Sequence, residues 1–209
     1  DKVTALDSVG GWISHLFQYV TGSLKDVTFE VFALEDVKSA DGESEDYYKK
    51  DELVATITTY DTGIAKVSGL PLGKYYVKEK ATVDGFVLDD EAREIDLTYR
   101  DQDTAEVTYS ADWQNNRQKA EVEVVKKEKD SDHVLEGAVF ALCAKEDITG
   151  ADGKVILKAD TVIEELATDK EGKLSFTADL PIGFAYYIKE TSPSSGFATT
   201  DEIQEFTFE

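Results

Sequence analysis

The sequence carries the stretch Phe29-Glu-Val-Phe-Ala-Leu-Glu-Asp36 and repeats its pattern 111 positions later, at Phe140-Ala-Leu-Cys-Ala-Lys-Glu-Asp147. The same offset relates Tyr76-Val-Lys-Glu79 to Tyr187-Ile-Lys-Glu190. A repeat at a fixed offset is the signature of a duplicated structural unit. The chain is therefore predicted to hold two copies of one domain, residues 1–118 and residues 119–209.

Each copy reads as a series of short strands. Runs rich in β-branched and aromatic residues alternate with Asp-Gly, Thr-Gly and Glu-Gly turns. In the first copy the predicted strands are residues 27–34, 53–59, 75–80, 94–99 and 105–113. Many short strands with regular turn signals predict an all-β fold, either an antiparallel sandwich or a barrel, in each copy.

Residues 12–20 depart from this strand pattern. The apolar residues Trp12, Ile13, Leu16, Phe17 and Val20 stand at near-helical spacing, and glycine-containing pairs bound the segment on both sides. This spacing predicts a short amphipathic helical insertion. An irregular strand is the alternative.

The chain is strongly acidic. Its 209 residues include 44 Asp and Glu against 22 Lys and Arg, a formal net charge of −22. A surface of this sign repels nucleic acids and anionic membranes, so neither is expected as a partner. The longest apolar run, residues 138–144, is far shorter than the roughly 20 residues of a membrane-spanning helix, so no membrane insertion is expected.

The inventory of reactive side chains is small. A single cysteine, Cys143, excludes an intramolecular disulfide, and two histidines cannot build a His-rich metal site. No HExxH motif, nucleophile elbow, P-loop or GxGxxG motif is present. The sequence therefore predicts no metal, no cofactor and no enzyme acting on an external substrate.

One lysine and one glutamate of the second copy are predicted to point into the same interior. Lys126 follows Val122 and Val124 on one face of a strand, and that face should be buried. Glu190 shares a face with Tyr186 and Ile188 on a later strand. Charged side chains are rarely buried unless they are paired, so the two are predicted to meet.

The first copy offers a related pair. Glu79 corresponds to Glu190 in the repeat. Asn115 follows Val107, Tyr109, Ala111 and Trp113 at alternating positions, so it is predicted to share their buried face on the last strand of that copy. Exposed strand positions for the glutamates, and a turn for Asn115-Asn116, are the plainer alternatives.

These residues lie in motifs that resemble the collagen-adhesin B-type domain, a family also found in the backbone pilins of Gram-positive bacteria. Three stretches carry the resemblance: Val122-Glu-Val-Val-Lys126 followed by Leu135-Glu-Gly-Ala-Val-Phe140, then Tyr187-Ile-Lys-Glu-Thr191, and Asn115-Asn-Arg-Gln-Lys119. The resemblance covers roughly residues 24–209. It implies a prealbumin-like or immunoglobulin-like sandwich for each copy.

The resemblance also implies a self-made cross-link. In the family a strand lysine attacks the side-chain amide of an asparagine, or an aspartate carboxyl, and a buried glutamate shuttles the protons. The implied cross-linking residues are Lys126 and Asn115, and the implied catalytic residues are Glu190 and Glu79. Burial disfavours the charged form of an amine, and packing holds the reactants in contact. The bond would form once, without turnover.

Neither copy shows the complete set of three residues. Lys2 is the only lysine before Lys25, so the first copy either uses Lys2 or forms no bond; the position 111 residues before Lys126 is His15. The second copy has no asparagine at the place that corresponds to Asn115. A strand donated by a partner could supply it, or the sequence is a truncated piece.

Two functions fit these features. The first is a structural stalk of a cell-wall-anchored, extracellular adhesin or pilus-like protein, with adjacent repeats of the same protein as its partners. The second is an adhesin module that binds a host protein or glycan. An exposed patch of Trp12, Phe17 and Tyr19 would favour the second function, and a buried one the first.

Overall fold

The computed structural model describes residues 2–6, 14–19 and 21–208. All secondary structure in these residues is β-strand, in antiparallel pairs, which confirms the all-β prediction. The contacts divide the chain into two units, which we call the middle unit (Gly22–Gln118) and the terminal unit (Asp1–Thr21 with Lys119–Glu209). This division differs from the predicted one, since Asp1–Thr21 goes with the second copy of the repeat.

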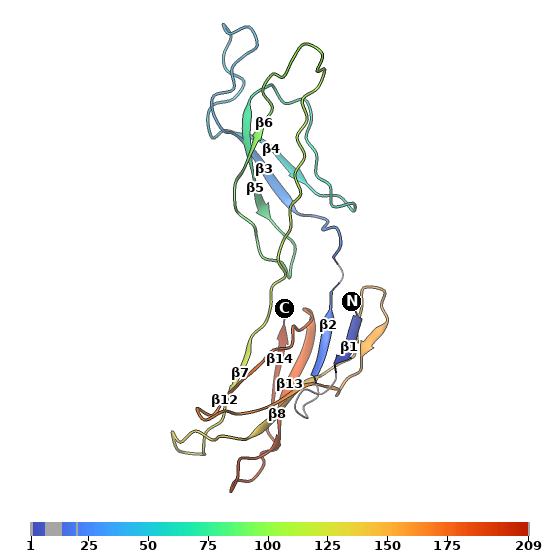
Figure 1. The fold of residues 1–209 in the computed structure, drawn as a ribbon, viewed down its shortest axis with the longest axis vertical. Coiled ribbons are helices and arrows are strands. Elements are labelled where there is room, and N and C mark those ends of the chain that lie inside the picture. Colours follow the sequence, from blue (N-terminus) through green and yellow to red (C-terminus); the bar gives the residue numbers. More distant parts are fainter. Residues whose placement is uncertain (1, 7–13, 20, 209) are drawn as a thin grey trace. The chain divides into compact units, whose positions relative to one another are not determined.

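The middle unit contains one four-stranded sheet, in the order β4-β3-β5-β6 (Figure 1). Its strands are β3 (Thr28–Ala33), β4 (Leu53–Thr58), β5 (Lys74–Ala81) and β6 (Arg93–Asp96). In β3, buried and half-buried residues alternate, because successive side chains of a strand point to opposite faces. One face of the sheet is covered by residues outside strands, among them Ala65, Val67, Leu70 and Trp113.

The terminal unit is a two-layer sandwich. One layer is a six-stranded sheet in the order β1-β2-β11-β8-β13-β14, and β12 and β7 form the other layer; β10 and β9 make a small separate pair. The bounds are β1 (Lys2–Leu6), β2 (Ser14–Gln18), β7 (Val122–Val125), β8 (Val139–Ala144), β9 (Ile148–Thr149), β10 (Val155–Leu157), β11 (Val162–Ala167), β12 (Lys173–Phe176), β13 (Phe184–Ser192) and β14 (Ile203–Phe208).

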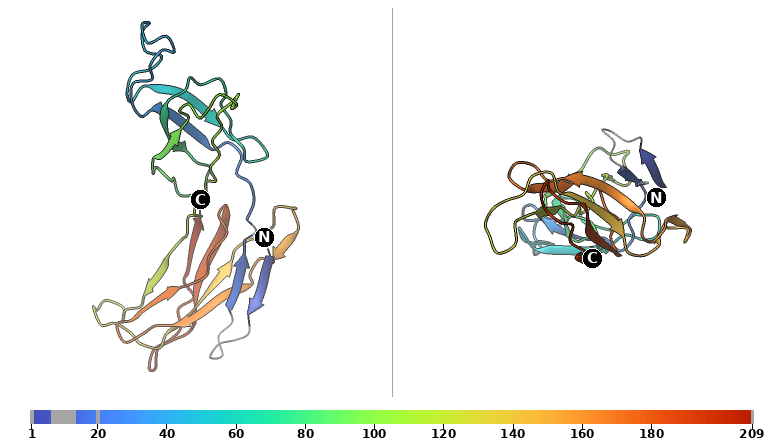
Figure 2. Two further views of the ribbon diagram at one scale, coloured as in Figure 1. Left: turned by 45° about the horizontal axis from the view of Figure 1, so that its top comes forward. Right: turned by 90° about the horizontal axis from the view of Figure 1, so that it is seen from below.

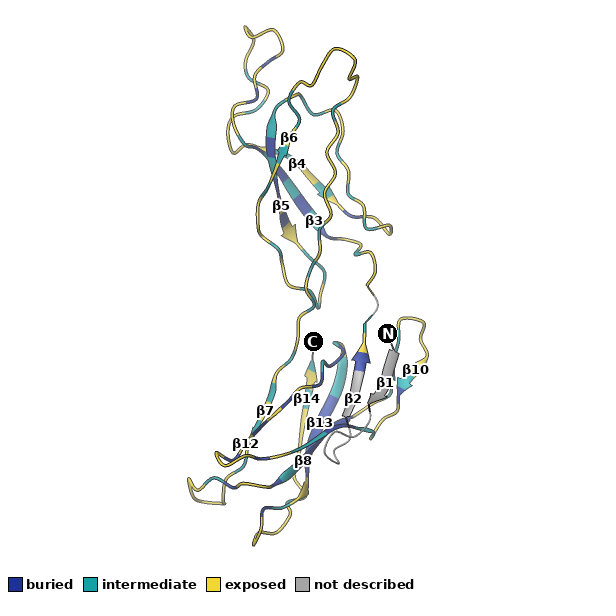
Figure 3. Ribbon diagram, in the orientation of Figure 1, coloured by how far each residue is buried: buried dark blue, intermediate teal, exposed yellow. Residues whose placement is uncertain are grey.

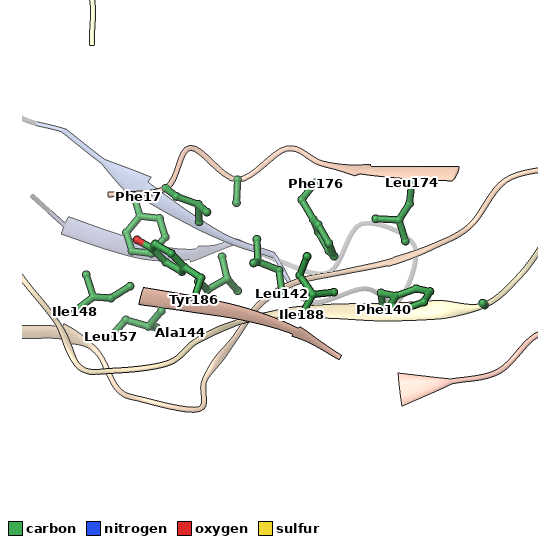
Figure 4. Close-up of a cluster of buried hydrophobic side chains, with 14 residues drawn as sticks. Phe17, Phe140, Leu142, Ala144, Ile148, Leu157, Leu174, Phe176, Tyr186 and Ile188 are labelled. Atoms are coloured by element: carbon green, nitrogen blue, oxygen red, sulfur yellow. The ribbon is translucent and has the colours of Figure 1, made fainter. Parts of the chain in front are cut away.

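The core of the terminal unit lies between these layers. Figure 4 shows Phe140, Leu142 and Ile188 of the large sheet facing Leu174 and Phe176 of β12. Buried residues concentrate along β8 and β13, which occupy the centre of the sheet (Figure 3). Near-continuous burial along β8 follows from this central position.

A tyrosine at the same place in both units shows the duplication in three dimensions. Tyr75 and Tyr186 are both fully buried, and each hydroxyl donates a hydrogen bond to a backbone carbonyl, of Pro71 at 2.6 Å and of Pro181 at 2.7 Å. Burial raises the pKa of Tyr75 to about 12 and raises that of Tyr186 as well. The repeated Leu-Pro-x-Gly turn therefore anchors the same core residue twice.

The helical prediction for residues 12–20 was wrong where the structure describes them. Ser14–Gln18 form β2, which pairs with β1 and, through Ser14 and Glu164, with β11. Figure 2 shows this amino-terminal hairpin beside the strands of the carboxy-terminal part. Phe17 is buried in the core beside Tyr186 (Figure 4), so burial at the sheet edge overrides the helical spacing. Residues 12, 13 and 20 lie outside the described residues.

The predicted strand 105–113 was also wrong. These residues form no strand, and Tyr109 is 47% exposed, so the alternating positions do not make one buried face. Trp113 nevertheless packs against the core of the middle unit, and Asn115 is half-buried. This segment therefore brings Trp113 and Asn115 to the sheet without forming a β-strand.

Candidate functional site

The predicted meeting of Lys126 and Glu190 is present in the terminal unit. Lys126 directly follows β7, and Glu190 lies on β13. The Lys126 Nζ lies 3.0 Å from Glu190 Oε1, with the glutamate side chain fully buried and the lysine side chain 19% exposed. The contact is an ion pair rather than an aligned hydrogen bond.

Backbone contacts fix the position of Lys126. Its N–H donates to the carbonyl of Gly172 at 2.8 Å, and its own carbonyl accepts from the N–H of Leu135 at 3.0 Å. Gly172 has a positive φ of 70°, and a Cβ at this position would lie 2.8 Å from the Lys126 carbonyl oxygen. A glycine is therefore required for β7 to approach the turn before β12 this closely.

The environment of the pair is mostly apolar. The Lys126 Nζ lies 5.8 Å from the centroid of the Phe140 ring, within the range of a cation–π contact. Glu190 Oε2 accepts a hydrogen bond from the N–H of Thr200 at 2.8 Å. One carboxylate oxygen is thus held by the backbone, and the other faces the lysine.

The middle unit holds the second predicted pair. Glu79, on β5, is 3% exposed. The Asn115 side-chain amide donates to both carboxylate oxygens of Glu79, at 2.7 and 2.8 Å, and is 3.2 Å from the carbonyl of Val87. The N–H of Asp89 lies 3.4 Å from Glu79 Oε1, matching the role of Thr200 in the terminal unit. Asn115 therefore contacts a buried carboxylate, which an exposed turn would not explain.

Trp113 and Arg93 form a stacked pair close to Asn115 in the sequence, of which only the burial of Trp113 was predicted. Trp113 packs edge-to-face on Phe29, with ring centroids 5.1 Å apart. The Arg93 guanidinium stacks on the indole at 3.7 Å and donates to the carbonyl of Asp112 and to the carboxylate of Asp89. No sequence motif points to Arg93, because its contacts join segments that no motif connects.

The structure brings together Lys126 with Glu190, and Glu79 with Asn115, in separate units. It does not place Lys2 in the unit of Glu79 and Asn115: Lys2 lies in β1, whose partner β2 joins the sheet of the terminal unit. No lysine or arginine within Gly22–Gln118, all of which the structure describes, forms an ion pair with Glu79.

The remaining candidates do not form a site. Cys143 is fully buried, and this burial raises the pKa of its thiol. Within residues 2–6, 14–19 and 21–208 no cluster of three His, Cys, Asp or Glu side chains has the arrangement of a metal site. The same residues contain no helix capable of crossing a membrane.

Comparison with known proteins was made for sequence and for structure. The family model described as the SpaA prealbumin-like fold domain matches residues 18–113 and again residues 120–209. No curated protein matches the chain.

Several solved structures are similar to the chain. The Bacillus anthracis TIE protein is 28% identical with a TM-score of 0.57, over 90% of this chain and 29% of that chain. The chain therefore spans less than a third of that structure. The shaft pilin SpaA of Lactobacillus rhamnosus GG is 18% identical with a TM-score of 0.34, over 97% of this chain and 88% of that chain. The minor pilin GBS52 of Streptococcus agalactiae is 20% identical with a TM-score of 0.28, over 90% and 79%.

The two matches of the family model cover most of the chain, and each falls on one copy of the repeat. The chain therefore belongs to the family of SpaA prealbumin-like fold domains, of which it carries two copies in tandem.

Proposed function

We propose that the chain is a structural stalk segment of an extracellular, cell-wall-anchored bacterial adhesin or pilus-like protein, braced by isopeptide bonds that it forms itself. Domains of this family are structural rather than catalytic. The observation that carries the proposal is the contact of 3.0 Å between Lys126 and the fully buried carboxylate of Glu190. A buried lysine beside a buried carboxylate is what a single-turnover amide-forming reaction requires.

The chemistry follows from the groups present. Glu190 takes a proton from the Lys126 ammonium, which leaves a neutral amine. That amine attacks the side-chain carbonyl carbon of an asparagine, the new C–N bond forms, and the old C–N bond breaks. Glu190 returns that proton to the departing nitrogen, which leaves as ammonia, and takes up the second proton that the attacking nitrogen loses, so the carboxyl ends protonated. A neutral amide then replaces the buried charge of the lysine.

The middle unit holds the glutamate and the asparagine that the same reaction requires. Its carboxylate, Glu79, already holds the amide of Asn115 in the orientation that proton delivery to the leaving nitrogen needs. Lys2 was the predicted nucleophile for Asn115, and its position in β1 gives that pairing no support.

Residues 119–209 contain no asparagine, so the asparagine for Lys126 lies outside them. In the middle unit, Val87 N–H donates to the Asn116 carbonyl and Gln118 N–H donates to the Gly85 carbonyl. The equivalent residues 196 and 198 have no such partners among the described residues, and Phe197 is 40% exposed. We infer that an added strand pairs here, as residues 116–118 do in the middle unit, and brings that asparagine to Lys126.

A ligand-binding role has less support. Phe17, a member of the aromatic patch that would mark a binding surface for a host protein or glycan, is 6% exposed and contributes to the core. Tyr19 is half-buried, and its hydroxyl donates to the Asp179 carbonyl at 2.7 Å. Both aromatics serve to attach the hairpin, as a stalk requires.

The test is covalent capture by Lys126. A synthetic peptide with the sequence of residues 105–118, which carries the Asn115 segment, is incubated with the full chain, and the denatured mass is measured. The expected product is chain plus peptide less one ammonia, with the branch at Lys126. The variant Lys126→Arg keeps the charge and should form no product, and Glu190→Gln should slow the reaction strongly. No product with the unaltered chain would contradict the proposed chemistry.

A further inference from the structure

The second layer of the terminal unit has no equivalent in the middle unit. In the terminal unit β12 pairs with β7, and the strand that bears Lys126 completes the sandwich. Residues 64–67 of the middle unit correspond to β12, yet they pair with no strand, and the unit has only the sheet β4-β3-β5-β6. The edge of β12 pairs with β7 in the terminal unit, whereas the equivalent edge at residues 64–67 of the middle unit pairs with no strand.

The turn that leads into this edge is the same in both units. Gly172 N–H donates to the Asp169 carbonyl, and Gly63 N–H donates to the Tyr60 carbonyl. A Cβ on Gly63 would lie 2.7 Å from the Cβ of Ser23, much as one on Gly172 would lie 2.8 Å from the Cβ of Val134. The middle unit thus keeps the geometry that receives a strand.

Side chains along the open edge are less covered than their counterparts. Leu174 and Phe176 of β12 are 6% and 5% exposed. The equivalent Ala65 and Val67 are only half-buried. An added strand would bury this apolar row.

The chain segment that the repeat assigns to this position is used elsewhere. The position 111 residues before Lys126 is His15, which lies in β2 and pairs with Ala5 of β1 in the sheet of the terminal unit. The middle unit therefore keeps Glu79 and Asn115 in contact without the lysine strand.

We propose that the middle unit captures an extended strand from another polypeptide, with the pattern of β7: alternating apolar residues that end in a lysine. The strand would lie antiparallel along residues 64–67. Its lysine would take the place relative to Glu79 that Lys126 has relative to Glu190. No lysine of residues 22–118 pairs with the buried carboxylate of Glu79, so a lysine is favoured at that point.

The capture ends in a covalent bond, and this step rests on the proposed function. Glu79 takes a proton from the incoming ammonium, the amine attacks the side-chain carbonyl carbon of Asn115, and the bond from that carbon to Nδ2 breaks. The proton passes to Nδ2, which leaves as ammonia, and Glu79 takes up the second proton that the attacking nitrogen loses as the amide forms. The chain and its partner are then joined by one amide.

The experiment uses the full chain and a peptide with the sequence of residues 120–129, Ala-Glu-Val-Glu-Val-Val-Lys-Lys-Glu-Lys. The expected product is an adduct of chain and peptide less one ammonia, with the branch at Asn115. Hydrogen exchange at residues 64–67 should slow as the peptide binds. A matched peptide with arginine in place of the lysine that corresponds to Lys126 should slow exchange at the same residues and form no adduct.

Two variants of the chain complete the test. Asn115→Ala should abolish the adduct, while Lys154→Arg should leave it unchanged, because Lys154 is exposed and pairs with Asp152 away from Glu79 and Asn115. The proposal is overturned if no adduct forms, if the adduct persists in Asn115→Ala, or if protection appears away from residues 64–67. Reaction of Lys126 with the 105–118 peptide would still stand in that case, so the two failures are distinguishable.

Discussion

The Lys126 ammonium lies 3.0 Å from the Glu190 carboxylate, although the two residues come from opposite layers of the terminal unit. The glutamate side chain has no solvent exposure. A charge in this position is stable only while its partner is present. The same ion pair should therefore affect both the stability of the terminal unit and the proposed cross-linking reaction of Lys126.

Replacement of the lysine tests this connection. Lys126→Met should lower the free energy of unfolding of the terminal unit by about 3–5 kcal/mol, because the buried carboxylate loses the cation that it contacts. Denaturant unfolding monitored by hydrogen exchange in β8 and β13 measures the loss. In the double variant Lys126→Met/Glu190→Gln the buried group is neutral, and most of the stability should return. Equal stability of the single variant and the unaltered chain would contradict the role of the pair.

Gly172 should be intolerant of a side chain for a reason beyond its backbone angle. Gly172→Ala places a Cβ 2.8 Å from both the Lys126 carbonyl oxygen and the Val134 Cβ. Gly153 has a similar φ of 74° and open space around it, so Gly153→Ala reports the angle alone, about 1 kcal/mol. Thermal unfolding of both variants should show at least twice that loss for Gly172→Ala. Equal losses would mean that β7 can shift away without cost.

The repeat predicted the strands that occupy equivalent places in the two units. Phe29 and Phe140, Glu79 and Glu190, and the two Leu-Pro-x-Gly turns hold equivalent places in the two units, because local pattern and tertiary position agree there. The contact of Lys126 with Glu190 was likewise predictable from strand alternation, whereas Asn115 reaches Glu79 from a segment that forms no strand.

The errors lie where a segment is placed by distant parts of the chain. The pattern of Phe17 and its neighbours is compatible with a helix, whereas pairing with β1 and with the edge of β11 makes it a strand. Lys2 was assigned to the first copy by its position in the sequence, whereas β1 follows β2 into the other unit. Nothing local in residues 2–18 encodes that choice, because strand pairing depends on the partner edge.

The loop around Asp41 should respond to acid. The pKa of Asp41 is lowered from its ordinary value of 3.8, chiefly by the hydroxyl of Ser44 and then by the backbone N–H of Ser44 and the hydroxyl of Ser39. A lowered pKa in the folded state means that these bonds stabilise the loop above pH 4 and are lost as the pH falls through the folded-state value. The Ser44 amide resonance should therefore stay constant from pH 8 to 5 and move only in strong acid. Asp41→Asn should remove that acid-induced movement, and a transition near neutral pH would contradict the assignment.

Phe17 should determine whether the amino-terminal hairpin stays attached to the terminal unit. Phe17 is 6% exposed within a core cluster that includes Ile163 and Tyr186, so Phe17→Ala removes a buried ring at a cost of about 3–5 kcal/mol. Hydrogen exchange should accelerate in β2 and β11, while β3 and β5 of the middle unit keep their rates. Phe197→Ala, at a position 40% exposed in the same unit, should leave all four strands unchanged. Unaltered exchange in β2 of Phe17→Ala would show that backbone pairing alone holds the hairpin, whereas acceleration in β3 would mean that the hairpin also stabilises the middle unit.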